Sequence, residues 1–195
     1  MTDTPQDSNP PDPFAMVANI RSRGPAPVHL WDPPYCGEIN MEIKRDGTWF
    51  HEGRPIRRPA MVQLFASILK REEDGRIYLV TPVEKVAIKI EDCPFVIVDM
   101  DVASAGDPGQ QQITFLTNTD ERFLLDGEHR LTITPDPETE EPHPVVHVRS
   151  GLDGLINRAV FYRLVDLAAE HLVEGQGRLG VWSAGTFFPF AETDV

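Results

Sequence analysis

The sequence predicts an α+β fold of two related subdomains from an internal duplication, mostly antiparallel sheet with one main helix per half. Three observations predict it: a block of residues recurs, strand-like runs far outnumber helical patterns, and an Asp-Gly turn marks an early hairpin. The recurring block is Ile56–Phe65, which lines up without a gap on Ile156–Val165. Two copies indicate a duplication, because a solenoid needs about three or more stacked units.

The first elements are a tail, a short helix and a hairpin. Residues 1–14 are acidic and rich in Pro, Ser and Asp, which predicts disorder, and Pro13–Arg23 carries a short helical pattern. Ile39–Arg45 and Thr48–His51 flank Asp46-Gly47, which supplies the positive φ of a type I′ turn. The expected division is a tail with a short helix over 1–25, an N-terminal subdomain over 26–82 and a C-terminal subdomain over 83–195.

The first main helix begins at Pro59, because a proline at the first helical position leaves no N–H without a partner. Its apolar stripe consists of Met61, Leu64, Phe65, Ile68 and Leu69. A series of strands follows at Arg76–Thr81, Val86–Ile90, Phe95–Val102, Gln112–Thr117, Phe123–Leu125, Leu131–Thr134 and Val145–Arg149. Runs of strands with few helices favour antiparallel α+β architecture over a parallel, doubly wound sheet.

The second main helix is predicted over Arg158–Val173, with Asn157 as its N-cap. Leu179–Ser183 and Thr186–Phe190 form two closing strands. Gly175–Gly180 spells the dinucleotide fingerprint G-x-G-x-x-G. That fingerprint must leave a strand and open a helix, whereas here it leaves the helical pattern and opens a strand, so we interpret it as a turn.

Charge favours a small anionic ligand. The chain has 195 residues, with 31 acidic and 18 basic side chains and a net charge of −13, which opposes binding to a nucleic acid polymer or an anionic membrane. Ten basic residues nevertheless fall between Lys44 and Lys89, against six acids. No signal peptide is predicted, and Cys36 and Cys93 suit reduced thiols, so we expect a cytoplasmic protein.

Metal and catalytic motifs are weak. His143 and His147 have a spacing that suits zinc on a helix, but Pro142 and Pro144 forbid that helix. Ser183 lacks the preceding glycine of a nucleophile elbow. We therefore expect no metal, no cofactor and no catalytic residue, and a binding protein in preference to an enzyme.

Arginines and aromatic rings recur near both copies of the block. Guanidinium groups bind phosphate in a bidentate manner and flat rings stack on bases, so this combination is typical of phosphate and base recognition. An ion-pair network with tryptophan in the core is the alternative interpretation. The predicted ligand-binding residues are Arg45, Trp49, His51, Arg57, Thr81, Lys85, Arg149 and Trp182.

Four segments carry a family resemblance: Trp31–Gly37, Asp46–Ile56, Tyr78–Val86 and Gly180–Ser183. Over about Trp31 to Phe190 the chain resembles a family of proteobacterial proteins built on a domain of unknown function. The resemblance implies a duplicated core, a C-terminal half superficially like a pleckstrin-homology domain, a site for a nucleotide-like ligand at the interface of the halves, and a role in signalling.

The sequence therefore predicts a ligand-binding sensor, with a small anionic molecule held between its two subdomains. Two alternatives stay open: a hydrolase or transferase acting on a nucleotide or phosphoester, and a protein-interaction module with a protein partner. The ligand, the pathway and the oligomeric state are not specified by the sequence.

Overall fold

The computed structural model describes residues 12–17, 25–137, 139–173 and 175–190, and these divide into two compact units. The first unit ends at Ile90 and leaves out the turn Lys44–Gly47. The second unit contains that turn and the described residues from Glu91 onward. Most of the predicted disordered tail, residues 1–11, lies outside the described residues, as do residues 18–23 of the predicted first helix.

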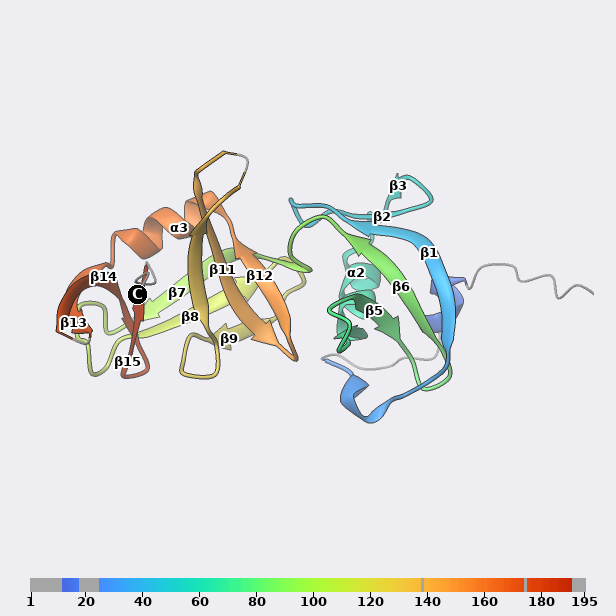
Figure 1. Ribbon diagram of the computed structural model, residues 1–195, viewed down its shortest axis with the longest axis horizontal. Helices are drawn as coiled ribbons and strands as arrows, with labels where there is room; N and C mark the ends of the chain where they lie inside the picture. The colour runs from blue at the N-terminus through green and yellow to red at the C-terminus, as the bar shows by residue number, and fades with distance from the viewer. Residues whose placement is uncertain (1–11, 18–24, 138, 174, 191–195) are drawn as a thin grey trace, which may run out of the picture. The chain divides into compact units, whose positions relative to one another are not determined.

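The first unit is a six-stranded sheet with a helix against it (Figure 1). Its helices are α1 (Pro13–Val17), the 3₁₀ turn η1 (Val28–Leu30) and α2 (Pro59–Ser67). Its strands are β1 (Tyr35–Ile43), β2 (Trp49–His51), β3 (Arg54–Pro55), β4 (Leu69–Arg71), β5 (Ile77–Val80) and β6 (Lys85–Ile90). They lie in the order β3-β2-β1-β6-β5-β4, and β1 and β6 are parallel while the other pairs are antiparallel.

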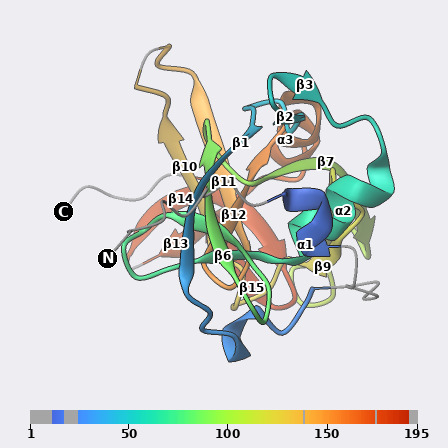
Figure 2. The same ribbon diagram turned by 90° about the vertical axis from the view of Figure 1, so that its right-hand side faces the viewer.

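The core of the first unit joins α2 to its sheet through aromatic rings. Trp49 and Phe65 are fully buried, and their rings stack with centroids 6.1 Å apart. The ring of Phe14, on α1, meets Phe65 edge-on at 5.6 Å, and Figure 2 shows α1 beside α2. Met16 and Val17 are buried as well, so apolar burial holds this short helix in place.

The second unit contains a six-stranded sheet, a three-stranded sheet and one helix. The strands of the larger sheet are β7 (Phe95–Ala103), β8 (Gln112–Thr117), β9 (Arg122–Leu124), β10 (Leu131–Pro135), β11 (Pro142–Arg149) and β12 (Leu152–Ile156). They are followed by α3 (Arg158–Val165), β13 (Ala169–Val173), β14 (Gln176–Ser183) and β15 (Thr186–Pro189). Val160 and Leu164 are buried on the inner side of α3, so that face of the helix joins the core.

The two six-stranded sheets have the same topology. The second sheet has the order β10-β11-β12-β7-β8-β9, and its first and last strands, β7 and β12, are parallel. Each sheet therefore consists of two three-stranded meanders joined by a parallel pairing of the first strand with the sixth. This shared order supports the predicted duplication, and the fold is α+β with one main helix in each half.

The helices occupy different places in the two halves. Along the chain, helix α2 comes between the third and fourth strands of its sheet, whereas α3 comes after the sixth strand. The recurring block aligns helix with helix, and both copies contain a helix followed by a strand, as predicted. Aligning the two copies of the block matches α2 with α3 and the strand that follows each helix. Aligning the two sheets in chain order instead matches β1 with β7 and β6 with β12, which leaves the helices at different positions. The likeness of the C-terminal half to a pleckstrin-homology domain stays a prediction.

Three boundaries differ from the sequence predictions. The predicted stripe of the first main helix reaches Leu69, but α2 ends at Ser67 and Leu69 begins strand β4. The predicted helix over Arg158–Val173 ends at Val165, because Ala169–Val173 pairs with β14 as an antiparallel strand. The predicted division between residues 82 and 83 falls between β5 and β6, which pair with each other in one sheet. Since β6 also pairs with β1, it belongs to the first unit, and the units divide after Ile90.

Candidate functional site

A hollow of about 600 Å³ lies in the first unit beside the N-terminus of α2. This volume is within the range of pockets that hold small molecules. The lining residues come from α1, from the β2–β3 hairpin and from the segment that enters α2. They are Phe14, His51, Glu52, Arg54, Pro55, Ile56, Arg57, Arg58 and Met61.

Local structure brings the hollow's polar side chains together. His51 and Arg54 are register partners across the tight turn of the β2–β3 hairpin, so they lie side by side. Arg58 is the N-cap residue of α2 in an extended conformation, and Pro59 begins the helix. No side chain caps α2 by a hydrogen bond, and its first turn carries no acidic residue. The N-terminus of α2 is therefore left without a side-chain acceptor.

Positively charged side chains outnumber negatively charged ones in the lining of the hollow. Among the residues that the structure describes, Arg54, Arg57 and Arg58 form no ion pair with a carboxylate. Three guanidinium charges thus gather near the positive end of a helix dipole, where cations are disfavoured. The carboxylate of Glu52 also lines the hollow, and it accepts a hydrogen bond from Asn40 Nδ2 at 3.3 Å. An anion in the hollow would offset the remaining positive charge.

The other half of the molecule provides an internal comparison. In the recurring block, Arg57 aligns with Asn157 and Arg58 with Arg158. The Asn157 side chain caps α3 by accepting a hydrogen bond from the Val160 N–H at 2.8 Å. Arg158 forms an ion pair with Glu141 at 2.7 Å. The helix start in the second half is thus satisfied by its own side chains, whereas the start of α2 is not.

Five of the predicted ligand-binding residues lie in the first unit, and the hollow brings two of them together, His51 and Arg57. Trp49 is a core residue whose indole Nε1 has no hydrogen-bond partner within the described structure. Thr81 is buried, and its hydroxyl interacts with its own loop through the N–H and carbonyl of Glu84. Neither Trp49 nor Thr81 is among the residues that line the hollow.

Lys85 is engaged by a carboxylate in the first unit. Its Nζ lies 3.3 Å from Glu72 Oε1 and 5.4 Å from the ring centroid of Tyr78. Glu72 also accepts from Lys70 at 3.2 Å. Burial would raise the pKa of Glu72, but the hydrogen bonds and charges of Lys70 and Lys85 outweigh burial and hold that pKa below its ordinary value of 4.5.

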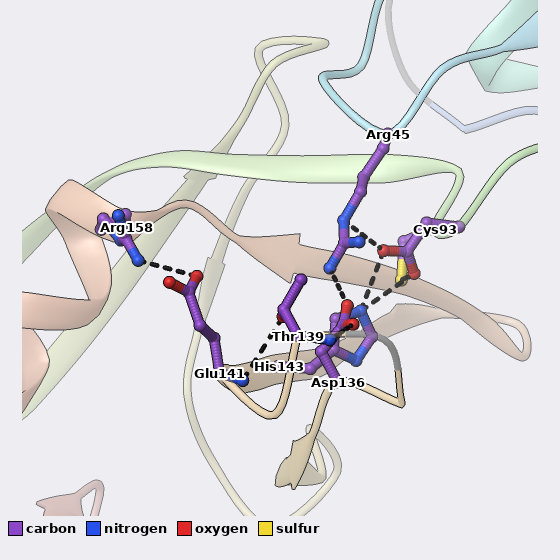
Figure 3. A network of polar contacts seen from close by, with 8 residues as sticks. Arg45, Cys93, Asp136, Thr139, Glu141, His143 and Arg158 are labelled. Atoms are coloured by element: carbon purple, nitrogen blue, oxygen red, sulfur yellow. Dashed lines mark hydrogen bonds and ion pairs between the residues drawn. The ribbon is translucent and has the colours of Figure 1, made fainter.

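The remaining predicted residues lie in the second unit, where Arg45 is the centre of a polar network (Figure 3). Its guanidinium group forms ion pairs with Asp92, at 3.2 Å, and with Asp136, which is 5% exposed. His143 Nε2 lies 2.9 Å from the same Asp92 carboxylate. Figure 3 shows Arg45, Asp136 and His143 pointing toward one another. His143, considered above as a zinc ligand, is thus a partner of Asp92.

Arg149 and Trp182 also have partners in the second unit. Arg149 Nε is 3.1 Å from Glu121 Oε2, and its guanidinium lies over the ring of Phe95. The indole ring of Trp182 packs against His171 and Phe187, with centroids 4.7 and 5.3 Å away. These contacts agree with the alternative interpretation of the sequence, in which the arginines form ion pairs and the tryptophans pack against other side chains.

The predicted ligand-binding residues do not include Phe14, Arg54 or Arg58. A signal for the two arginines was present, because Arg54, Arg57 and Arg58 fall within one short segment directly before a proline that begins a helix. Phe14 could not be found in this way, since it comes from a distant part of the chain. The Gly175–Gly180 fingerprint contributes to the β13–β14 hairpin, which confirms that it is not a strand-to-helix phosphate loop.

The described residues contain no group of three or more His, Cys, Asp and Glu side chains that could hold a metal ion. Within the same residues, no helix has the length and apolar character needed to cross a membrane.

Comparisons with known proteins agree with the division into two parts. A family model described as the N-terminal domain of DUF1285, a domain of unknown function, matches residues 26–93. A second, for the C-terminal domain of DUF1285 proteins of unknown function, matches residues 94–190. No curated protein matches the chain.

Two crystal structures of DUF1285 family proteins are similar to this chain. The one from Silicibacter pomeroyi DSS-3 is 52% identical with a TM-score of 0.83, over 92% of this chain and 94% of that one. The one from Shewanella baltica OS155 is 26% identical with a TM-score of 0.49, over 65% of this chain and 91% of that one.

Proposed function

Since the chain belongs to the DUF1285 family, whose function is unknown, we propose from the chemistry of the hollow that the protein binds a small anionic ligand there. The ligand's charged group would lie against Arg54, Arg57 and Arg58 at the start of α2. This proposal keeps the predicted ligand class, a nucleotide-like anion. It places the ligand within the first unit, where the lining residues are.

The observation that carries the proposal is the contrast between the two helix starts. Arg158 and the N–H groups of α3 have side-chain partners, while Arg57, Arg58 and the start of α2 have none among the described residues. Guanidinium groups bind phosphate and carboxylate oxygens in a bidentate manner, and a helix N-terminus favours negative charge. Both features therefore support an external anion as the missing partner.

Binding is favoured over catalysis by the composition of the lining. The described lining residues include no Ser, Thr or Cys nucleophile, so chemistry in the hollow would have to rest on His51 and Glu52. A binding protein without chemistry suits the predicted sensor role, in which the ligand stabilises the conformation that binds it best. The hydrolase or transferase alternative predicts turnover of a phosphoester, which the same ligand panel can detect.

Thermal-shift measurement tests the proposal. The panel contains inorganic phosphate, simple phosphate monoesters and nucleoside monophosphates, with neutral analogues of the same size. A ligand at about 100 times its dissociation constant should stabilise the protein by roughly 2.7 kcal/mol. Arg57→Ala and Arg58→Ala should each weaken binding by about tenfold or more, because a charge-assisted contact is lost.

Arg158→Ala is the matched control, since Arg158 aligns with Arg58 and has a carboxylate partner of its own. It should leave ligand affinity unchanged. Equal stabilisation by anionic and neutral compounds, or equal affinity losses in the Arg58 and Arg158 variants, would reject the hollow as the anion site.

A further inference from the structure

We infer that the ligand carries its anionic group on a flat aromatic ring, as an aryl phosphate monoester does, and that Phe14 is the residue that selects the ring. The inference rests on the proposed function and goes further, because it names the chemical class of the part that the arginines do not contact. The juxtaposition behind it is that an exposed phenyl ring and a cluster of guanidinium groups line one hollow.

Phe14 is an aromatic wall of the hollow. Its side chain meets His51 edge-on, with centroids 5.2 Å apart and planes at 82°, and also contacts Phe65. The residue nevertheless stays 40% exposed, although it lies among apolar neighbours. A phenyl ring that packs on one side and lines a hollow on the other offers a surface for a second flat ring.

A cap and buried neighbours on the same helix hold Phe14 in a fixed position. Asp12 caps α1 through its Oδ1, which accepts a hydrogen bond from the Phe14 N–H at 3.0 Å. Met16 and Val17 on the same helix are 7% and 1% exposed, so burial fixes the backbone that presents Phe14. A pre-positioned ring loses little conformational entropy when a ligand ring stacks on it.

The rest of the lining combines apolar and charged side chains. Pro55, Ile56 and Met61 join Phe14 as the apolar part, while the charged side chains are those of the arginines and Glu52. A monoester phosphate carries a charge of about −1.5 to −2 at neutral pH, which matches several guanidinium groups better than a carboxylate does. A bare phosphate would leave the apolar part filled with water.

Three small probes separate the anion from the ring: methyl phosphate, cyclohexyl phosphate and phenyl phosphate. They share the phosphate group, and the last two differ in flatness more than in size. By calorimetry, phenyl phosphate should bind about threefold to tenfold more tightly than cyclohexyl phosphate, the range that aromatic pairs add beyond area burial. Methyl phosphate should bind more weakly than either.

The Phe14→Leu variant should lose the preference for phenyl over cyclohexyl phosphate while keeping its affinity for methyl phosphate. The retained methyl phosphate affinity shows that the variant is folded around the arginines. Tyr162→Leu, which removes an exposed aromatic ring that does not line the hollow, is the control and should keep the preference. Arg57→Ala should weaken all three probes together.

The outcomes distinguish the two proposals. If none of the three phosphates binds, the proposed function itself fails. If methyl phosphate binds but phenyl and cyclohexyl phosphate bind equally, the anion site stands and the aromatic class is wrong. A preference that persists in Phe14→Leu would also overturn the inference, because the ring would then be selected elsewhere.

Discussion

The side-chain amide of Asn118 donates a hydrogen bond to the carbonyl oxygen of Gly47 across 3.1 Å. The same side chain accepts a hydrogen bond from the Val96 N–H at 3.0 Å, so both of its polar atoms are engaged. Gly47 has φ +82°, and a Cβ built on it would lie 2.5 Å from Asn118 Nδ2. The Asp46-Gly47 turn thus needs glycine for two reasons, the backbone conformation and the close approach of Asn118.

Gly47→Ala should therefore lower the free energy of unfolding by more than the cost of placing alanine in a left-handed backbone conformation. Placing an L-residue at such a φ costs about 1–2 kcal/mol. Displacing Asn118 should add about 1–3 kcal/mol, because partly buried hydrogen-bonding groups lose their partners. Urea denaturation of wild type and variant measures the sum.

Gly75→Ala is the matched control for this prediction. Gly75 has φ +79°, and a Cβ there would meet no atom within 4 Å, so only the conformational cost applies. Equal losses of stability in the two variants would show that the contact with Asn118 contributes nothing.

Most of the fold was predictable because local signals and tertiary packing agree. The Asp46-Gly47 hairpin, the helix beginning at Pro59 and the Asn157 cap each rest on short-range chemistry, and the structure contains all three. The predicted type I′ turn is absent, because Asp46 has no positive φ and residues 44–48 separate the paired strands. Residues 169–173 form a strand, although their sequence pattern predicted the end of a helix. They are mostly exposed and pair with β14, so a strand pairing across a tight hairpin decides their conformation.

The candidate site was less predictable, because an arginine's partner is set by tertiary structure. Arg45, Lys85 and Arg149 share the charge of Arg57, but the first three have carboxylate partners in the folded chain. The neighbouring sequence does not show which basic residues will have a carboxylate partner and which, like Arg57, will not. The distant residue Phe14 shows the same limit for the apolar part of the hollow.

Asn157→Ala should destabilise the second unit by about 0.5–2 kcal/mol, the usual cost of removing an N-cap acceptor. Its side-chain oxygen holds the Val160 N–H, and Val160 is buried against the core, so fraying of this turn would expose apolar surface. Asn157→Ser should recover most of the loss, since serine is also a good N-cap. Circular dichroism during urea denaturation follows both variants, and a serine variant as unstable as the alanine variant would contradict the cap.

The protein should become less stable as the pH is lowered through the titration range of Glu72. Its pKa in the folded protein lies below 4.5, so the folded state binds fewer protons than the unfolded state in that range. The contribution of Glu72 is thus fully present above 4.5 and is lost as pH falls through the lower, folded pKa. Glu72→Gln should flatten part of the acid limb of the stability curve when urea denaturation is followed against pH.

Arg45→Ala and Lys85→Ala should lower stability without weakening anion binding, whereas Arg57→Ala and Arg58→Ala should do the reverse. Removing Arg45 takes an ion-pair partner from Asp136, which is 5% exposed, and such a loss costs about 1–3 kcal/mol. The arginines of the hollow have no described partner to lose, and removing mutual repulsion can even stabilise the free protein. Measuring melting temperature and phosphate affinity on all four variants gives two independent readouts, and an Arg45 variant that melts normally but no longer binds the anion would reverse the assignment.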